Sequence, residues 1–299
     1  MKKVISLLFV AFIVINNAFG QDASFTQFNS APLWYNPAFA GSITEKRAEV
    51  LYRDQWPKIS GGGYQTIYAS YDQYVKRVRG GIGFMSTYDN AFGALRTFTN
   101  SLAYAPKIKI KKFSISPGIK FSYVYTSIDI SKLTFGDMID SYGGYTGTTS
   151  ETVYPSVSYF DLSSGVVLNT TSFYVGFDVE HLLEPNESFV GGESPLPRRY
   201  ALTAAYTYQS KNKKISITPN LLWQKQQDFY MLMTTATFKY KWFLVGGGYR
   251  FGDAMLAMAG IEFHGLRINY SYDNTTSTLN SVTGGTGGAH EVSLRCLIK

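Results

Sequence analysis

Hydrophobic and polar residues alternate with a period of two along much of the chain after residue 43. The clearest stretch runs from Phe113 to Tyr123, where large apolar residues or Pro occupy every second position and Ser, Gly and Lys occupy the positions between. Side chains of a β-strand point alternately to its two faces, so this pattern predicts strands with one apolar and one polar face. The same alternation recurs at 173–179, 200–208 and 266–272.

A soluble sandwich would show the same alternation. Its repetition behind a secretory signal, with aromatic residues at the strand ends, predicts instead an all-β chain, an antiparallel outer-membrane β-barrel of about fourteen strands. An even number of strands is typical of single-chain bacterial barrels. The predicted strands are 44–56, 63–75, 79–88, 94–106, 112–125, 157–168, 172–181, 199–209, 214–224, 229–240, 242–251, 255–263, 265–273 and 290–298.

The connections between these strands fall into two kinds that alternate along the chain. Those at 126–156, 182–198 and 274–289 are long and poor in Lys, whereas several others are short and basic. Periplasmic turns of such barrels are short and extracellular loops are long, so the basic turns are expected at the periplasmic end. They predict either a docking surface for a periplasmic partner or a belt facing anionic lipid head groups. Their basic residues include Lys76, Arg77, Lys109, Lys111, Lys112, Lys211, Lys213 and Lys214.

Two segments precede the predicted barrel, which spans 43–299. Residues 1–20 read as a signal peptide, with Lys2 and Lys3 before an apolar run and Ala18-Phe19-Gly20 before the expected cleavage site. Residues 21–42 are aromatic and do not alternate, and a disordered leader would not be so rich in aromatic residues. This segment is expected to be buried, either as a plug or brace in the lumen or against a partner. It ends in a motif that contains Asn36, Pro37, Ala38 and Gly41.

Composition agrees with a membrane barrel. Aromatic residues make up 16% of the chain, with 23 Tyr, and charged residues only 16%. Barrels carry aromatic girdles at both membrane interfaces, which accounts for this balance. The net charge of +7 is too small and too scattered to indicate nucleic-acid binding. Cys296 is the only cysteine, which excludes an intramolecular disulfide or a CxxC site, and no cofactor is expected.

Charged residues within the predicted strands have the parity of the polar face. Charge facing lipid is costly, so these residues are expected to line the lumen. A selective pore usually shows one dominant sign of charge, whereas here both signs occur and are expected to pair and fill the interior. The residues are Lys120, Asp178, Glu180, Arg250, Glu262, Arg267, Asp273, Glu291 and Arg295.

The sequence gives little support for catalysis. His181, His264 and His290 do not form a metal-binding spacing such as HExxH. The one close pair of a His and an acid, His290-Glu291, consists of strand neighbours that point to opposite faces. An enzyme is therefore not expected.

Several motifs occur in one order along the chain. The sequence QDASFTQF at 21–28 is followed by NPAFAG at 36–41, YRDQW at 52–56, KLTFGD at 132–137, YSYD at 270–273 and HEVSL at 290–294. In these motifs the chain resembles the PorP/SprF family of Bacteroidetes outer-membrane proteins. The resemblance implies a fourteen-stranded barrel associated with type IX secretion and gliding motility, without catalytic residues. It also implies roles in the export or surface attachment of large adhesins, and for some members contact with a periplasmic ring.

These observations lead to one functional hypothesis and one alternative. The hypothesis is an outer-membrane component of type IX secretion that binds a secreted adhesin, or its C-terminal signal domain, at the cell surface. The expected partners are this adhesin, the periplasmic ring proteins and outer-membrane lipid. The alternative is a diffusion channel or transporter barrel for small or hydrophobic solutes. For the first hypothesis, the acidic residues expected to meet the partner are Asp137, Asp140, Glu151, Glu184, Glu187 and Glu193.

Overall fold

The computed structural model describes residues 22–59, 61–139, 146–147, 149–150, 152–278 and 285–299. The predicted signal peptide and the two loop residues Asp140 and Glu151 lie outside the described residues.

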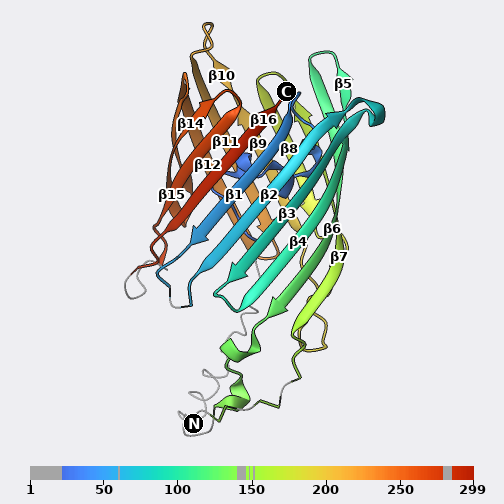
Figure 1. The fold of residues 1–299 in the computed structure, drawn as a ribbon, viewed down its shortest axis with the longest axis vertical. Helices are drawn as coiled ribbons and strands as arrows, with labels where there is room; N and C mark the ends of the chain where they lie inside the picture. The colour runs from blue at the N-terminus through green and yellow to red at the C-terminus, as the bar shows by residue number, and fades with distance from the viewer. Residues whose placement is uncertain (1–21, 60, 140–145, 148, 151, 279–284) are drawn as a thin grey trace, which may run out of the picture.

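The strands form one antiparallel sheet that closes on itself, because β1 pairs with β2 on one side and with β16 on the other (Figure 1). The described residues form sixteen strands, but the short strands β5 and β10 continue β4 and β9. The barrel is therefore fourteen-stranded, as predicted. The strands are β1 (Lys46–Gln55), β2 (Tyr64–Val75), β3 (Gly80–Ala91), β4 (Leu95–Pro106), β5 (Ile108–Ile110), β6 (Phe113–Ile128), β7 (Ser156–Asn169), β8 (Phe173–Glu180), β9 (Arg199–Tyr206), β10 (Tyr208–Gln209), β11 (Ile215–Gln226), β12 (Phe229–Tyr240), β13 (Phe243–Arg250), β14 (Ala254–Phe263), β15 (Leu266–Thr275) and β16 (Ala289–Ile298).

Proline accounts for the two interruptions. The register of β4 against β6 continues unchanged in β5, since Tyr104 pairs with Ile119 and Ile108 with Ile115. Pro106 and Pro117 lie in the gap, and neither has an N–H to donate to the ladder. The prediction that Lys109 lies in a turn between the strands 94–106 and 112–125 is therefore wrong, because Lys109 belongs to β5. The single strand predicted at 199–209 is likewise divided, opposite Pro219 of β11.

The two faces of the wall follow the alternation in the sequence. In β6, the side chains of Phe121 and Tyr123 are exposed on the outside, whereas those of Lys120 and Ser122 are buried inside. Large apolar residues occupy the outward positions around most of the barrel, as hydrocarbon requires. Among the described residues, no helix is long and apolar enough to cross a membrane.

The connections separate by length between the two ends of the barrel. The C-terminus and the short turns lie at the end drawn uppermost in Figure 1, and the long connections lie at the opposite end. We call these the turn end and the loop end. The 3-10 helix η3 (Lys76–Val78) is a turn between β2 and β3, and η4 (Ile130–Lys132) and η5 (Gly136–Met138) belong to the long β6–β7 connection. By loop length, the turn end is expected to face the periplasm.

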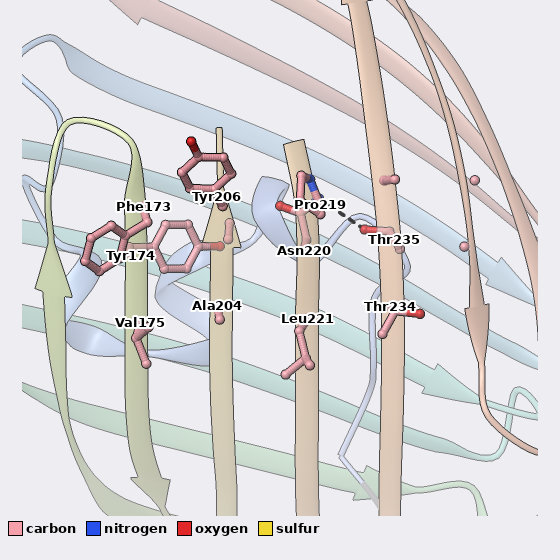
Figure 2. A pocket seen from close by; sticks show the side chains of 14 residues that line it. Phe173, Tyr174, Val175, Ala204, Tyr206, Pro219, Asn220, Leu221, Thr234 and Thr235 are labelled. Carbon is pink, nitrogen blue, oxygen red and sulfur yellow. Dashed lines mark hydrogen bonds between the residues drawn. The ribbon is translucent and has the colours of Figure 1, made fainter. Parts of the chain in front are cut away.

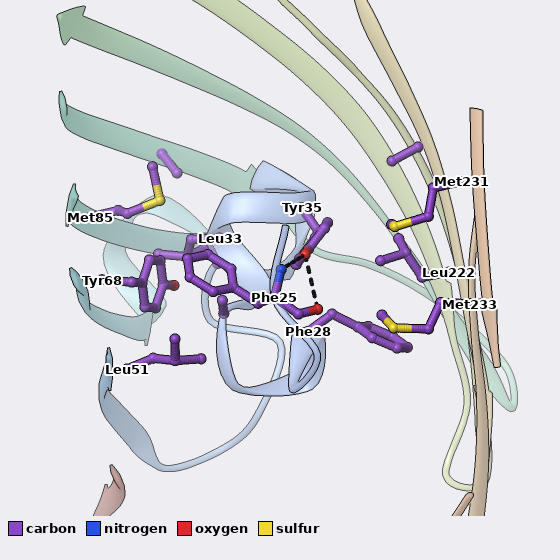
Figure 3. Close-up of a cluster of buried hydrophobic side chains, with 14 of the residues drawn as sticks. Phe25, Phe28, Leu33, Tyr35, Leu51, Tyr68, Met85, Leu222, Met231 and Met233 are labelled. Atoms are coloured by element: carbon purple, nitrogen blue, oxygen red, sulfur yellow. Dashed lines mark hydrogen bonds between the residues drawn. The ribbon is translucent and has the colours of Figure 1, made fainter. Parts of the chain in front are cut away.

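The N-terminal segment, residues 22–42, lies inside the barrel. It contains η1 (Phe28–Ser30), α2 (Pro32–Tyr35) and η2 (Pro37–Phe39), which occupy the lumen in blue in Figure 1. Apolar side chains of the segment pack against the inner face of the wall on two opposite sides of the lumen (Figure 3). This core joins Phe25, Phe28, Leu33 and Tyr35 of the segment to Leu51, Tyr68, Met85, Leu222, Met231 and Met233 of the wall.

Candidate functional site

The end of the N-terminal segment packs directly on lumen-facing glycines of the wall. A Cβ added to Gly118 of β6 would stand 2.5 Å from Ala38 Cα, and one added to Gly83 of β3 would stand 2.7 Å from a methyl carbon of Leu33. A Cβ on Gly81 would collide with the backbone of Ala40. Such close approach of two backbones is possible only where the wall residue has no side chain. These glycines therefore form a cradle for the segment.

Asn36 connects the segment to the wall by hydrogen bonds. Its Nδ2 donates to the carbonyl oxygens of Phe177 at 3.1 Å and Val166 at 3.3 Å, and its Oδ1 accepts from the amide of Ala38 at 2.8 Å. The side chain is fully buried, so all three bonds are shielded from water. Asn36 thus caps η2 and joins it to β7 and β8 at the same time.

Glu291 of β16 holds the other part of the segment. Its two carboxylate oxygens accept from successive backbone amides, Thr26 N at 2.9 Å and Gln27 N at 2.7 Å. Arg53 of β1 bridges this carboxylate, at 3.0 Å, and Asp273 of β15, at 2.9 Å. The hydroxyl of Thr26 donates to Asp273 and accepts from Arg53. Backbone amides and a hydroxyl of the N-terminal segment therefore supply hydrogen bonds that the buried charged groups of the wall need.

The nine charged residues predicted for the lumen all point inward in the structure, and most of them pair. Lys120 and Glu180 form an ion pair at 2.5 Å, and Arg250 and Asp273 form one at 3.1 Å. The Glu262 carboxylate forms an ion pair with Arg295 at 3.0 Å and also pairs with Arg267 and Lys239 near the turn end. Asp178 is buried, and within the described part of the chain its carboxylate has no hydrogen-bond partner.

A second charged cluster anchors the beginning of the segment near the loop end. His181, which follows β8, contacts Asp22 through Nε2 at 2.9 Å and Asp161 through Nδ1 at 2.7 Å. Arg199 at the start of β9 lies 3.0 Å from the same Asp22 carboxylate. Burial alone would lower the pKa of His181, but the charge of Asp22 and hydrogen bonds to Asp161 and Asp22 raise it to about 10. Burial would raise the pKa of Asp22, yet His181 and Arg199 hold it well below its ordinary value.

Sequence reasoning did not single out Arg53, Arg199, Asp22 or Asp161 as parts of these clusters. The inward parity of Arg53 and Asp161 within their strands was the available signal, since Arg53 shares its face with Leu51 and Asp161 shares its face with Ser163. No pattern in the sequence could pair Asp22 with His181, because 159 positions separate them.

Of the acidic residues expected to meet a partner, the structure describes four, all in the long loops, and the carboxylates of two of them have partners within the chain. The carboxylate of Asp137 accepts from the Ser150 amide at 2.6 Å, which links the two ends of the β6–β7 connection and lowers the pKa of Asp137. Glu184 pairs with Arg198 at 3.0 Å. Glu187 is half-buried and Glu193 is exposed.

The predicted basic residues gather at the turn end. Lys76 and Arg77 lie in η3, Lys111 and Lys112 form the turn between β5 and β6, and Lys211, Lys213 and Lys214 lie between β10 and β11. The turns of these strands meet at one rim of the barrel (Figure 1).

The histidine and acid neighbours His290 and Glu291 point to opposite faces of β16. His290 faces outward, where its Nδ1 lies 2.7 Å from the Tyr270 hydroxyl, and Glu291 faces inward. Among the described residues, no group of three or more His, Cys, Asp or Glu side chains is placed to hold a metal ion.

Comparisons with known proteins place the chain in a family. The family model described as type IX secretion system membrane protein PorP/SprF matches residues 17–296. No curated protein matches. Among solved structures, the outer membrane protein Omp33 of Acinetobacter baumannii is similar at 6% identity and a TM-score of 0.49, over 86% of this chain and 100% of that chain. The CymD monoaromatic hydrocarbon channel is similar at 10% identity and a TM-score of 0.48, over 93% and 95%.

The match covers nearly the whole chain, including the segment in the lumen and the strands of the wall up to residue 296 in β16. The family and the fold are those of a structural outer-membrane barrel. The chain belongs to the PorP/SprF family of type IX secretion system membrane proteins and is an outer-membrane barrel component of that system.

Proposed function

We propose that this barrel binds a secreted adhesin, or the C-terminal signal domain of one, and holds it at the cell surface. The observation that carries the proposal is the occupied lumen in a member of a secretion family. A wall built around its own N-terminal segment serves as a rigid support for surface loops, because residues 22–42 pack against it from inside the lumen.

The contacts of the N-terminal segment support this role over the alternative of a diffusion channel. Phe25, Leu33 and Asn36 are completely buried, and Glu291 and Arg53 hold the segment from the wall. A free channel would have to break these bonds and leave buried charges without partners, which is strongly unfavourable.

The loop end offers the surface for the partner. The long connections carry the exposed apolar side chains Ile139, Tyr154, Leu183 and Val190 together with the acidic residues described above. Exposed apolar groups beside charged ones are typical of protein-binding surfaces. The backbone amide of Tyr154 donates to the carbonyl of Phe189 at 2.8 Å, so the β6–β7 and β8–β9 connections form one continuous surface.

A loop replacement tests the proposal. Residues 130–154 are replaced by a short Gly/Ser linker, which leaves β6 and β7 intact, and the tagged barrel is purified from native outer membranes in mild detergent. We expect the parent barrel to retain a large secreted protein, identified by mass spectrometry, and the variant to lose it while the barrel still assembles. Unchanged recovery of the adhesin, or unchanged surface retention in cells, would contradict the proposal.

The channel alternative has its own measurement. A diffusion channel conducts ions in planar bilayers in the wild-type form, whereas we expect the wild-type barrel to be closed. Steady conductance without any change to the N-terminal segment would favour the alternative.

A further inference from the structure

The outer surface of the wall is hollowed in one place. A recess of about 650 Å³ opens across β8, β9, β11, β12 and β13 (Figure 2). Its volume is within the range of ordinary ligand-binding pockets. The recess lies on the outward face, which the bilayer covers, and therefore outside the lumen and away from the long loops used in the proposed function.

Small outward residues cause the recess. Pro219 pairs with Ala236, and Ala236 pairs with Gly247, so the three form one row across neighbouring strands. Tyr206 and Phe173, both well exposed, stand at the side of this row. Most other outward positions carry large apolar side chains, so the outer surface of the barrel is hollowed where the small residues lie.

The hydrogen-bonded ladder of the wall is interrupted at the recess. Strand β9 ends at Tyr206 and β10 begins at Tyr208, and Pro219 on the facing strand has no N–H to offer. The floor of the recess includes the inward residues Asn220 and Thr235, which are joined by a hydrogen bond of 3.2 Å.

A cluster of cations lies above the recess at the turn end. Lys211, Lys213 and Lys214 lie in the β10–β11 turn, and the backbone amide of Lys241 donates to the carbonyl of Lys214 at 2.7 Å, which joins the next turn to it. All four side chains are exposed, and none forms an ion pair with another described residue. The cluster therefore offers unneutralised positive charge at one rim.

The spacing of the two features matches a membrane lipid. Five positions separate Pro219 from Lys214 and Ala236 from Lys241, which is about 17 Å along a strand. With the usual strand tilt this corresponds to a depth of about 13 Å, close to the half-thickness of the hydrocarbon core of about 15 Å. A head group held at the lysines would thus place an acyl chain against the small-residue row.

We propose that the recess and the four lysines form a binding site for one anionic phospholipid of the periplasm-facing leaflet. The phosphate of the lipid binds the lysine cluster, and one acyl chain fills the hollow over Pro219, Ala236 and Gly247. The charge selects this occupant, because a neutral solute would gain nothing from the lysines. A second copy of this chain would bring its own copies of the same cations against them.

Lipid retention in vesicles tests the site. The full barrel is reconstituted into vesicles of equal parts phosphatidylglycerol and phosphatidylethanolamine, extracted in mild detergent and examined by native mass spectrometry. We expect one retained phosphatidylglycerol per barrel. Ala236→Trp fills the recess and should abolish retention, and Ala259→Trp, an outward residue of β14 outside the recess, is the matched control.

A second variant separates charge from shape. Replacing Lys211, Lys213, Lys214 and Lys241 by Gln should reduce the preference for phosphatidylglycerol over phosphatidylethanolamine by about tenfold. The control replaces the basic residues of two other turns, Lys76, Arg77, Lys111 and Lys112, by Gln and should leave the preference unchanged. Circular dichroism verifies that each variant is folded.

Several results would overturn the proposal. These are a wild-type barrel that retains no lipid, equal retention by Ala236→Trp and Ala259→Trp, and a dimer that forms through this face in place of lipid binding. Equal loss of preference in both lysine variants would also contradict it, because the site would then be only a general basic belt.

Discussion

Gly118 of β6 lies so close to Ala38 of the N-terminal segment that a Cβ on the glycine would stand 2.5 Å from the Ala38 Cα. Because the contact joins backbone to backbone, no rotation of a side chain can make room for a substituent. The relationship explains why the barrel wall carries a glycine within β6, where glycine usually weakens pairing.

Gly118→Val should expel the end of the N-terminal segment from its cradle. We expect a loss of about 1–3 kcal/mol in the free energy of unfolding, typical of overpacking, together with faster proteolysis of residues 22–42. Urea unfolding in lipid and mass spectrometry of limited digests measure the two effects. Gly136→Val is the control, because a Cβ at Gly136 meets no atom within 4 Å. Equal effects of both substitutions would disprove the cradle.

Arg53→Met should destabilise the barrel more strongly. The substitution leaves Asp273 and Glu291 buried without the cation that bridges them, and breaking a buried ion pair from one side costs about 3–5 kcal/mol. The measurement is urea unfolding, with Arg96→Met at an exposed position as the control. Adding Asp273→Asn and Glu291→Gln should restore part of the loss, and failure of this rescue would show that packing rather than charge is responsible.

Attachment of the segment at Asp22 should depend on pH. The pKa of His181 is raised from 6.5 to about 10, so its contribution is complete below about pH 6.5 and is lost as the pH rises toward 10. The pKa of Asp22 is lowered from 3.8, so its contribution is complete above that value and is lost in stronger acid. Attachment should therefore be strongest between about pH 4 and pH 6.5.

Trp34 of the segment gives the signal for this titration, because it packs against Phe25 and Arg199 in the lumen. The fluorescence difference between wild type and Trp34→Phe should shift as the pH rises from 6.5 to 10, and His181→Gln should remove this dependence. A pH profile that is the same in His181→Gln would contradict the assignment.

Val292→Arg should block assembly, whereas Ile298→Arg should be tolerated. Both side chains point outward from β16. Val292 lies within the strand, away from both of its ends, whereas Ile298 is its last residue and lies at the rim of the barrel. A lipid-facing Arg costs about 2–4 kcal/mol at the bilayer midplane and about 0–1 kcal/mol near the interface. Yields of heat-modifiable barrel on gels compare the two, and similar yields would show that this face of β16 does not contact hydrocarbon.

The alternation of residues, together with the secretory signal and the aromatic strand ends, was enough to predict the barrel. A period of two needs only local geometry, so the strands, their outward and inward faces and the separation of short turns from long loops could all be derived from the sequence. Prolines limited the accuracy, because the pattern passes unbroken through Pro106, Pro117 and Pro219 although the hydrogen-bonded ladder does not.

Only the tertiary structure decided what fills the barrel. The aromatic character of residues 21–42 indicated burial but left the lumen and a partner as alternatives. Contacts such as Glu291 with the Thr26 amide and His181 with Asp22 join positions more than 150 residues apart. The recess likewise depends on which strands lie side by side, because Pro219, Ala236 and Gly247 become one row only when the register of three strands brings them together.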